Sequence, residues 1–111
     1  MQEVYSKQMK KDIKLVKKQG KSRQALQDIV DEIKSGKPLD DKYQEHYLTN
    51  NYKGCRECHI TPDWLLIYRI DKKENKLYLV RTGSHSELYE DFTNLTIKQI
   101  NLKLSEYLKN S

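Results

Sequence analysis

Three runs rich in Tyr, Ile, Leu and Val follow one another in the second half of the chain, at residues 53–60, 64–70 and 76–82. Runs of this composition are typical of β-strands. The links between them, "TPD" and "DKKEN", are short. Short links join antiparallel neighbours, because parallel strands need a long crossover. The sequence therefore predicts a three-stranded antiparallel meander.

Two amphipathic segments precede the meander, after a short predicted strand, "QEVY". Ser6 is placed to cap a helix over residues 7–19, which Gly20 ends. Ser22 is placed to cap a second helix, which ends near Gly36. Apolar side chains recur at helical spacing in both segments, at Met9, Ile13, Val16, Leu26, Ile29, Val30 and Ile33.

The predicted order of elements is strand, two helices, three strands and a last helix over residues 95–109. This order indicates an α+β domain, in which an N-terminal strand and a helical hairpin pack on an antiparallel sheet. A chain of 111 residues is expected to form one domain. Because 36% of its residues are hydrophobic and 33% are charged, we expect a small core under a very polar surface.

The composition also bears on location and partners. No run of about 18 apolar residues is present to span a bilayer, and the N-terminal residues lack the apolar segment of a secretory signal. We therefore expect a cytoplasmic protein that does not contact membranes and keeps its cysteines reduced. The net charge is +5, and residues 1–24 carry eight Lys or Arg against Glu3 and Asp12. This run fits either a solvated helix face or a surface that meets phosphates.

The stretch Cys55-Arg56-Glu57-Cys58-His59 matches the C-x-x-C-H pattern of covalent haem attachment. On a strand, however, the two cysteines point to opposite faces, because side chains alternate. A structural zinc site would need further ligands, usually a second cysteine pair. We therefore expect no metal and no other cofactor, and we interpret the two cysteines as small strand residues.

All three histidines of the chain flank the predicted strands. His46 lies in the loop that enters the sheet, His59 near the end of the first strand, and His85 just beyond the third. Asp63 and Arg81 lie in the same window. These groups suit RNA cleavage, in which the 2′-hydroxyl of the substrate is the nucleophile. Histidine can serve as base or acid because its unperturbed pKa is about 6.5, and the planar guanidinium of arginine matches phosphate oxygens.

Other side chains of this window suit RNA binding. Tyr89 and Tyr47 are candidates to stack a splayed base near the cut. Lys53 and Arg56 are candidates to bind phosphates, although solvated positions at a strand edge explain them equally well. Trp64 is expected in the core.

Together these fragments resemble the YafQ branch of the RelE/ParE toxin superfamily. The resemblance is carried by "HYL", "YKGCRECHITPDWLLIYRI" and "LYLVRTGSHSELY", and it covers about residues 1–90. It implies a RelE-like fold and a toxin of a bacterial type II toxin–antitoxin system. It further implies a ribosome-dependent mRNA interferase, an endoribonuclease that cuts translated mRNA without a metal and so inhibits translation.

The resemblance also implies a catalytic set of His46, His59, Asp63, Arg81 and His85. We expect His46 to be the general base, His85 the acid or a phosphate contact, and Arg81 the group that stabilises transition-state charge. His59 and Asp63 would position or polarise the others, and for Asp63 a structural role in the turn remains an alternative. Where relatives place a terminal Phe, this chain has Tyr89.

The expected partners are the ribosome, mRNA and a small, partly disordered antitoxin encoded beside the toxin. Promoter DNA would be bound only through that antitoxin. The chain departs from the family in continuing beyond a core of residues 1–92 with an extension, residues 93–111, whose expected helix would cover exposed sheet or the hairpin. Two other functions stay open at this point: a toxin of the same fold that acts on DNA gyrase, and a non-enzymatic module that binds nucleic acid or a partner.

Overall fold

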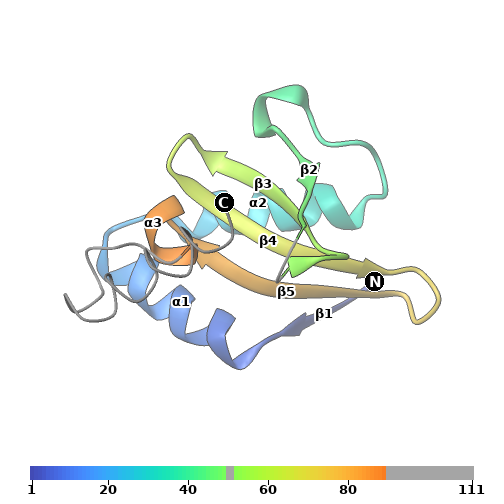
Figure 1. The fold of residues 1–111 in the computed structure, drawn as a ribbon, viewed down its shortest axis with the longest axis horizontal. Coiled ribbons are helices and arrows are strands. Elements are labelled where there is room, and N and C mark those ends of the chain that lie inside the picture. The colour runs from blue at the N-terminus through green and yellow to red at the C-terminus, as the bar shows by residue number, and fades with distance from the viewer. Residues whose placement is uncertain (50–51, 90–111) are drawn as a thin grey trace, which may run out of the picture.

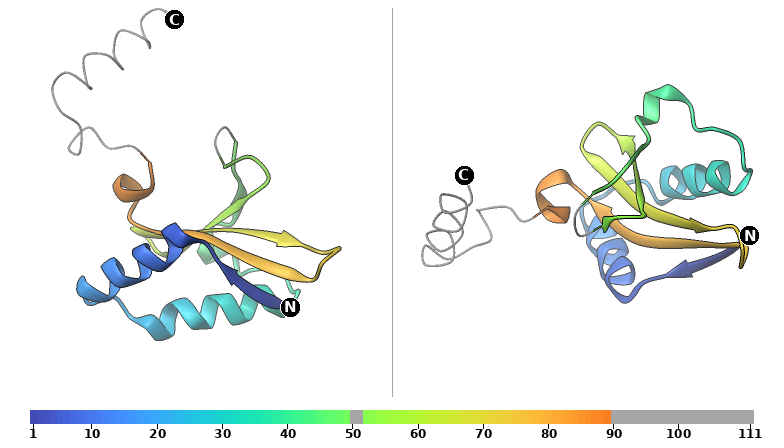
Figure 2. Two further views of the ribbon diagram at one scale, coloured as in Figure 1. Left: turned by 90° about the horizontal axis from the view of Figure 1, so that it is seen from below. Right: turned by 45° about the vertical axis from the view of Figure 1, so that its right-hand side comes forward.

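The computed structural model describes residues 1–49 and 52–89. The elements in chain order are β1 (Gln2–Tyr5), α1 (Lys7–Lys18), α2 (Arg23–Lys34), η1 (Asp41–Tyr43), β2 (His46–Tyr47), β3 (Arg56–Thr61), β4 (Trp64–Asp71), β5 (Lys76–Gly83) and α3 (His85–Leu88). The strands form one sheet in the order β1-β5-β4-β3-β2, and α1 and α2 lie along one of its faces (Figures 1 and 2). No helix in the described part of the chain is long and apolar enough to span a bilayer.

The predicted α+β fold and its antiparallel meander are confirmed, because β3 pairs with β4 and β4 with β5 in antiparallel register. Two pairings were not predicted. β1 joins the edge of the sheet parallel to β5, which makes the sheet mixed, and the two-residue strand β2 pairs with β3. The predicted helix at residues 95–109, and with it the extension at 93–111, lies outside the described residues.

The first strand of the meander begins later than predicted, at Arg56 instead of residue 53. Gly54 has φ +90°, a conformation that L side chains rarely adopt. The Cys55 N–H donates to the Tyr52 carbonyl at 2.9 Å and closes a turn. The composition of the run predicted a strand from residue 53, but this turn delays the start of β3 to Arg56.

The helical hairpin forms as its caps predict. The Ser6 hydroxyl accepts a hydrogen bond from the Met9 N–H at 2.8 Å, and the Ser22 hydroxyl accepts one from the Ala25 N–H at 3.2 Å. Both helices turn their apolar stripes to the sheet. The larger core cluster accordingly contains Met9, Val16, Leu26, Ile29, Val30 and Ile33 from the helices and Cys58, Trp64, Leu66, Tyr68, Leu77 and Leu79 from the strands.

The central strand β4 is buried on both faces. Trp64, Leu66 and Tyr68 belong to the cluster under the helices, whereas Leu65 and Ile67 belong to a smaller cluster on the opposite face. That second cluster is covered by Leu88 of α3 and by partly buried residues that include Leu48, Tyr52 and Tyr89. The face of the sheet that carries no long helix is therefore closed at one end, and the candidate site is built there.

The buried face of α1 gives a test of the packing. Met9 is 0% exposed, so Met9→Ala leaves a cavity and should lower the free energy of unfolding by about 2–5 kcal/mol. Leu15 on the same helix is 43% exposed, so Leu15→Ala should change it by less than about 0.5 kcal/mol. Urea unfolding followed by circular dichroism measures both. Equal losses would contradict this orientation of α1.

Candidate active site

A buried carboxylate, Glu57 on β3, lies at the centre of the candidate site. Glu57 is 2% exposed, and β2 pairs with β3 so that His46 lies directly opposite it. The Nε2 atom of His46 is 3.4 Å from one carboxylate oxygen, and the Tyr89 hydroxyl donates to the other. A buried carboxylate without partners would be strongly unfavourable. The Tyr89 hydroxyl therefore ties the end of α3 to β3, and His46 forms an ion pair that ties β2 to β3 when its ring is protonated.

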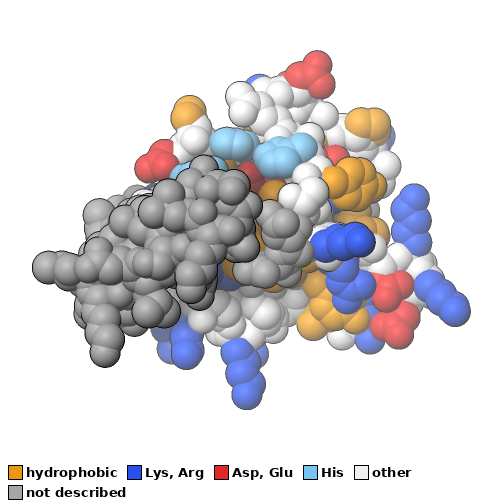
Figure 3. Space-filling view, viewed as in Figure 1, with side chains coloured by type: hydrophobic (Ala, Val, Ile, Leu, Met, Phe, Trp, Pro, Cys, Tyr) orange, Lys and Arg blue, Asp and Glu red, His pale blue; other side chains and the backbone are white. Residues whose placement is uncertain are grey.

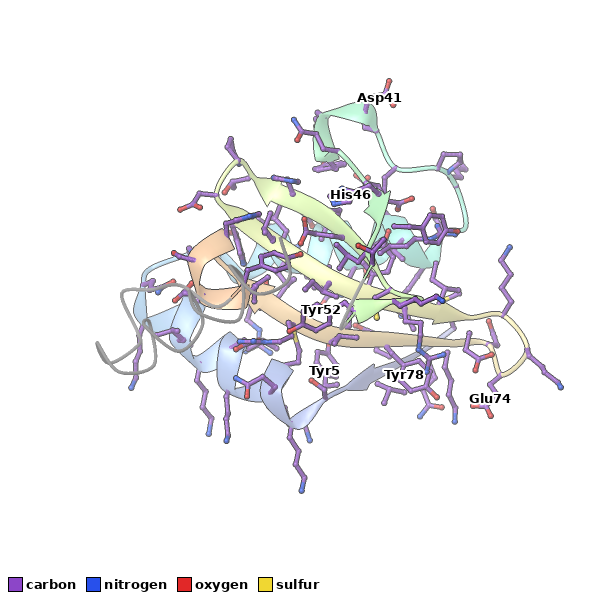
Figure 4. All side chains as sticks on the ribbon, in the orientation of Figure 1. Tyr5, Asp41, His46, Tyr52, Glu74 and Tyr78 are labelled. Carbon is purple, nitrogen blue, oxygen red and sulfur yellow. The ribbon has the colours of Figure 1, made fainter. Side chains whose placement is uncertain are left out.

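The aromatic rings beside Glu57 form a contiguous group. The ring of His85 lies 4.8 Å from that of Tyr89, and Tyr52 meets Tyr89 edge-to-face at 6.3 Å. Burial and then the adjacent Glu57 raise the pKa of the Tyr89 phenol, so its hydroxyl stays protonated and keeps donating. His46 and Tyr52 are labelled in Figure 4.

The two histidines of this group are held differently. The Nδ1 atom of His46 is 3.0 Å from the Gln44 carbonyl, which can only accept. The Nδ1 atom must therefore carry a proton, and in the neutral ring Nε2 is the nitrogen with the free lone pair. His85 is the first residue of α3, and its ring is exposed. Ser84 and Glu87 fix the start of this short helix through a reciprocal capping box.

Arg81 is held by a carboxylate of α1. The Nε and Nη2 atoms of Arg81 donate to the two oxygens of Asp12 at 3.0 and 3.1 Å. The same carboxylate accepts from the Thr82 N–H at 3.2 Å and from the Gln8 side chain at 3.1 Å. The bond to Asp12 raises the pKa of Arg81, burial opposes the rise, and Tyr52 adds to it. The guanidinium keeps further N–H groups for a ligand, since it has five and Asp12 engages two.

His59 and Asp63 lie at the tip of the β3–β4 hairpin. The Nδ1 atom of His59 is 3.3 Å from the Pro62 carbonyl, which leaves Nε2 of the neutral ring as an acceptor. Asp63 is exposed in the turn that follows Pro62. Figure 3 shows histidine side chains gathered on one part of the molecular surface.

Three sequence candidates do not join this group. Tyr47 follows His46 on β2 and pairs with Arg56, so strand alternation turns both side chains to the other side of the β2–β3 ribbon. There the Arg56 guanidinium lies 4.7 Å from the Tyr47 ring centre and donates to its hydroxyl at 2.6 Å. Lys53 is exposed in the turn before β3. The structure thus separates Tyr47 and Arg56 from the histidines.

The cysteine pair takes the positions that strand alternation predicts. Cys58 belongs to the core cluster under the helices and Cys55 to the cluster on the opposite face. Burial, followed by the nearby carboxylates of Glu45 and Glu57, raises the pKa of Cys58 to about 12, so its thiol stays protonated at neutral pH. No group of three or more His, Cys, Asp or Glu side chains suited to a metal ion occurs among residues 1–49 and 52–89.

Comparison with known proteins identifies the family of this chain. The family described as "Bacterial toxin of type II toxin-antitoxin system, YafQ" matches residues 1–90. The chain belongs to the YafQ toxin family. A family member from Escherichia coli (strain B / BL21-DE3), named mRNA interferase toxin YafQ, is 38% identical over 86 residues, which are 77% of this chain and 91% of the relative.

Solved structures of bacterial toxins have the same fold. A metal-bound toxin from Helicobacter pylori is 44% identical, with a TM-score of 0.75 over 80% of this chain and 99% of its own. YafQ in the E. coli DinJ-YafQ toxin-antitoxin complex is 36% identical, with a TM-score of 0.70 over 78% of this chain and 94% of its own. The YafQ family resemblance predicted from the sequence is thereby confirmed.

Sequence reasoning missed three residues of this YafQ-family site: Asp12, Tyr52 and Glu57. Asp12 gave a signal, because it falls within the apolar stripe between Met9 and Val16, where an unpaired carboxylate would be costly. For Glu57 the signal was weaker: strand alternation placed its side chain on the same face as the candidate residue His59. The sequence around Tyr52 carries no pattern that indicates its contact with Tyr89.

Asp12 provides a test of the site's framework. Asp12→Asn places an amide donor against the Arg81 guanidinium and the Thr82 N–H, so it should lower the free energy of unfolding by about 2–4 kcal/mol. Asp31→Asn on α2 is a matched control, because exposed Asp31 accepts from Gln27 at 2.9 Å much as Asp12 accepts from Gln8. Its effect should stay below about 0.5 kcal/mol. Urea unfolding that gives both variants the same stability would disprove the role of Asp12.

Proposed function

We propose that this chain is the toxin of a type II toxin–antitoxin pair and acts as an mRNA interferase, an endoribonuclease that cuts translated mRNA. The observation that carries the proposal is the grouping of His46, His85 and Tyr89 around buried Glu57 in a chain of the YafQ family. E. coli YafQ, whose name states mRNA interferase activity, supports the substrate class. Loss of translated messages then inhibits translation.

In the proposed reaction His46 is the general base. Its Nδ1–H donates to the Gln44 carbonyl, which fixes the tautomer whose Nε2 can accept the proton of the RNA 2′-hydroxyl. The 2′-oxygen then attacks the neighbouring phosphorus and displaces the 5′-oxygen. Glu57 lies 3.4 Å from Nε2 and stabilises the positive charge that the ring gains on accepting the proton.

The remaining roles follow from exposure and charge. His85 is exposed beside Tyr89 and serves as the acid that protonates the leaving 5′-oxygen, or as a phosphate contact. Arg81, fixed by Asp12, stabilises the charge of the pentacovalent transition state with its remaining N–H groups. Tyr89 has its hydroxyl bound to Glu57 and offers its ring, rather than its hydroxyl, to a base.

His59 and Asp63 complete the proposed set at the tip of the β3–β4 hairpin. With Nδ1 bound to the Pro62 carbonyl, His59 holds its ring in one orientation and polarises or positions the substrate through Nε2. Asp63 acts from the neighbouring turn. Lys53 lies exposed before β3 and contributes to phosphate binding. Every step uses protein side chains and the substrate hydroxyl, so the proposed cleavage needs no metal.

The proposed partners are the ribosome, mRNA and a cognate antitoxin. Helix α1 carries Lys7, Lys10, Lys11, Lys14, Lys17 and Lys18, and none of them pairs with a carboxylate among the described residues. This basic face suits docking on ribosomal RNA, because phosphate neutralisation supplies most sequence-independent affinity. The E. coli DinJ-YafQ complex supports an antitoxin partner. Action on translated mRNA implies a cytoplasmic location, and promoter DNA would be bound only through the antitoxin.

His85→Ala tests the proposal directly. The His85 residue is exposed, its ring lies beside that of Tyr89, and its side chain has no hydrogen bond or ion pair among the described residues, so the variant should fold normally. It should lose growth arrest on induction and slow mRNA cleavage by about 10²- to 10⁴-fold. Mapping mRNA 5′ ends, with and without ribosomes, measures the effect. Ser86→Ala, the next exposed position of α3, should cleave like the wild type.

Other outcomes of that experiment point elsewhere. Cleavage of transcripts by the wild type, at the same rate after His85→Ala, would contradict the assigned role of His85. Growth arrest by the wild type with intact transcripts and broken DNA would indicate action on gyrase. Arrest that persists in a His46→Ala, His59→Ala, His85→Ala triple variant would indicate a binding module instead of an enzyme.

A further inference from the structure

A polar groove lies between Tyr47 of β2, the start of β3 and the last residues of β4. It has a volume of about 460 Å³, and its lining comprises the polar side chains of Tyr47, Arg56, Arg69, Asp71 and Lys72 together with Gly54 and Ile70. We call it the Tyr47 groove. It arises because β3 pairs with β4 only as far as Arg56 and Tyr68, whereas β4 continues to Asp71. The side of β4 toward β3 is therefore open over its last residues. Figure 2 shows the β4–β5 hairpin extending beyond the other strands.

The charge of the Tyr47 groove suits a polyanion. Arg56, Arg69 and Lys72 line the groove beside one carboxylate, Asp71, which accepts from the Glu74 N–H at 3.0 Å within the hairpin turn. Arg56 is already paired with Glu45 at 3.4 Å, so the cations available to a ligand are Arg69 and Lys72. Arg69 and Lys72 form no ion pair with any described residue. Arg69 instead lies with its guanidinium 4.3 Å from the Tyr78 ring centre, a contact that holds it in place without neutralising it.

The aromatic group of the groove is unusually accessible. Tyr47 is 67% exposed, the most exposed of the large hydrophobic side chains among residues 1–49 and 52–89. Arg56 packs on its ring and donates to its hydroxyl, so the ring is fixed while most of its surface remains free. A fixed, exposed aromatic ring between cations is the combination by which proteins bind single-stranded nucleic acid, through base stacking and phosphate contacts.

The position of the groove relative to His46 selects RNA as its occupant. His46 and Tyr47 are consecutive residues of β2, so their Cα atoms are about 3.8 Å apart while their side chains point to opposite sides. An RNA strand whose scissile phosphate lies at His46 therefore has the Tyr47 groove within reach of its neighbouring nucleotides. An acidic peptide would pair with the same cations but has no nucleobase to stack on the exposed ring.

We propose that the Tyr47 groove is a second RNA subsite, which binds nucleotides that flank the scissile phosphate. The Tyr47 ring stacks one base, and Arg69 and Lys72 bind backbone phosphates. This inference rests on the proposed function, because it takes the flanking RNA from the message cut at His46. Its contribution is to substrate affinity, whereas the group around Glu57 determines the rate of the chemical step.

Two adjacent lysines of the β4–β5 turn give a matched test. Lys72 lines the groove and Lys73 does not, yet both are exposed and carry the same charge. All variants are made in the full chain carrying His85→Ala, so that the RNA is not cleaved during the measurement. Binding of a fluorescein-labelled single-stranded 12-nucleotide RNA is followed by fluorescence anisotropy. Lys72→Gln should weaken binding and reduce the slope of log K against log salt by about 0.7, the value for one phosphate contact in single strands. Lys73→Gln should leave both unchanged.

The stacking contact is tested in the same assay. Tyr47→Ala should weaken RNA binding about tenfold or more, in line with the loss of one stacked base. Tyr5→Ala, which removes another exposed tyrosine from β1 outside the groove, should have no effect. Circular dichroism checks that each variant is folded.

Several results would overturn the inference. These are equal affinities of the Lys72→Gln and Lys73→Gln variants, RNA binding unchanged by Tyr47→Ala, or no RNA binding by any of these proteins. Weaker binding of the purified cognate antitoxin with unchanged RNA affinity would likewise overturn it and identify a protein-binding surface. A separate assay of wild-type cleavage on programmed ribosomes decides the proposed function. Cleavage there, without the expected RNA-binding differences, would remove only the second subsite.

Discussion

The carboxylate of Asp12 joins the helical hairpin to the sheet at the place where regular strand pairing stops. β1 pairs with β5 only as far as Tyr5 and Leu79. Beyond that point the Ser6 hydroxyl donates to the Val80 carbonyl, and the Thr82 N–H donates to Asp12. The start of α1 thus replaces the missing strand partner. Because the same carboxylate binds Arg81, the contact that docks the helix also fixes the position of Arg81.

Glu57 has the corresponding role on the other side of the site. A two-residue strand such as β2 has little stability of its own. Its attachment to β3 is reinforced by His46 at Glu57 and by the Leu48 N–H, which donates to the Cys55 carbonyl at 2.9 Å. Tyr89 reaches the same carboxylate from the end of α3. Two buried carboxylates, each with several partners, therefore assemble the site from four separate parts of the chain.

The features predicted correctly from the sequence are those fixed by local patterns. Capping serines, apolar stripes and short links define α1, α2 and the meander, because each depends on residues close in the chain. The parallel pairing of β1 with β5 joins segments more than 70 residues apart and has no local signature. The start of β3 was wrong because the conformation of Gly54 overrides strand composition. The histidines of the candidate site were named from the sequence, and their roles stay a prediction. Asp12 and Tyr52 could not be named, because their partners in the site lie far away in the chain.

The register of β2 on β3 determines to which side of the sheet His46 and Tyr47 each point. A slip of one residue would move Tyr47 to the face of Glu57 and His46 to the opposite face, because strand side chains alternate. The residue before β2 opposes that slip: Glu45 accepts from the buried Tyr68 hydroxyl and from Arg56 at 3.4 Å. Burial and then the bond to Glu45 raise the pKa of Tyr68, so this donor persists at all physiological pH values. Glu45 thereby keeps His46 and Tyr47, to which we assign proton transfer and base stacking, on opposite sides of one strand.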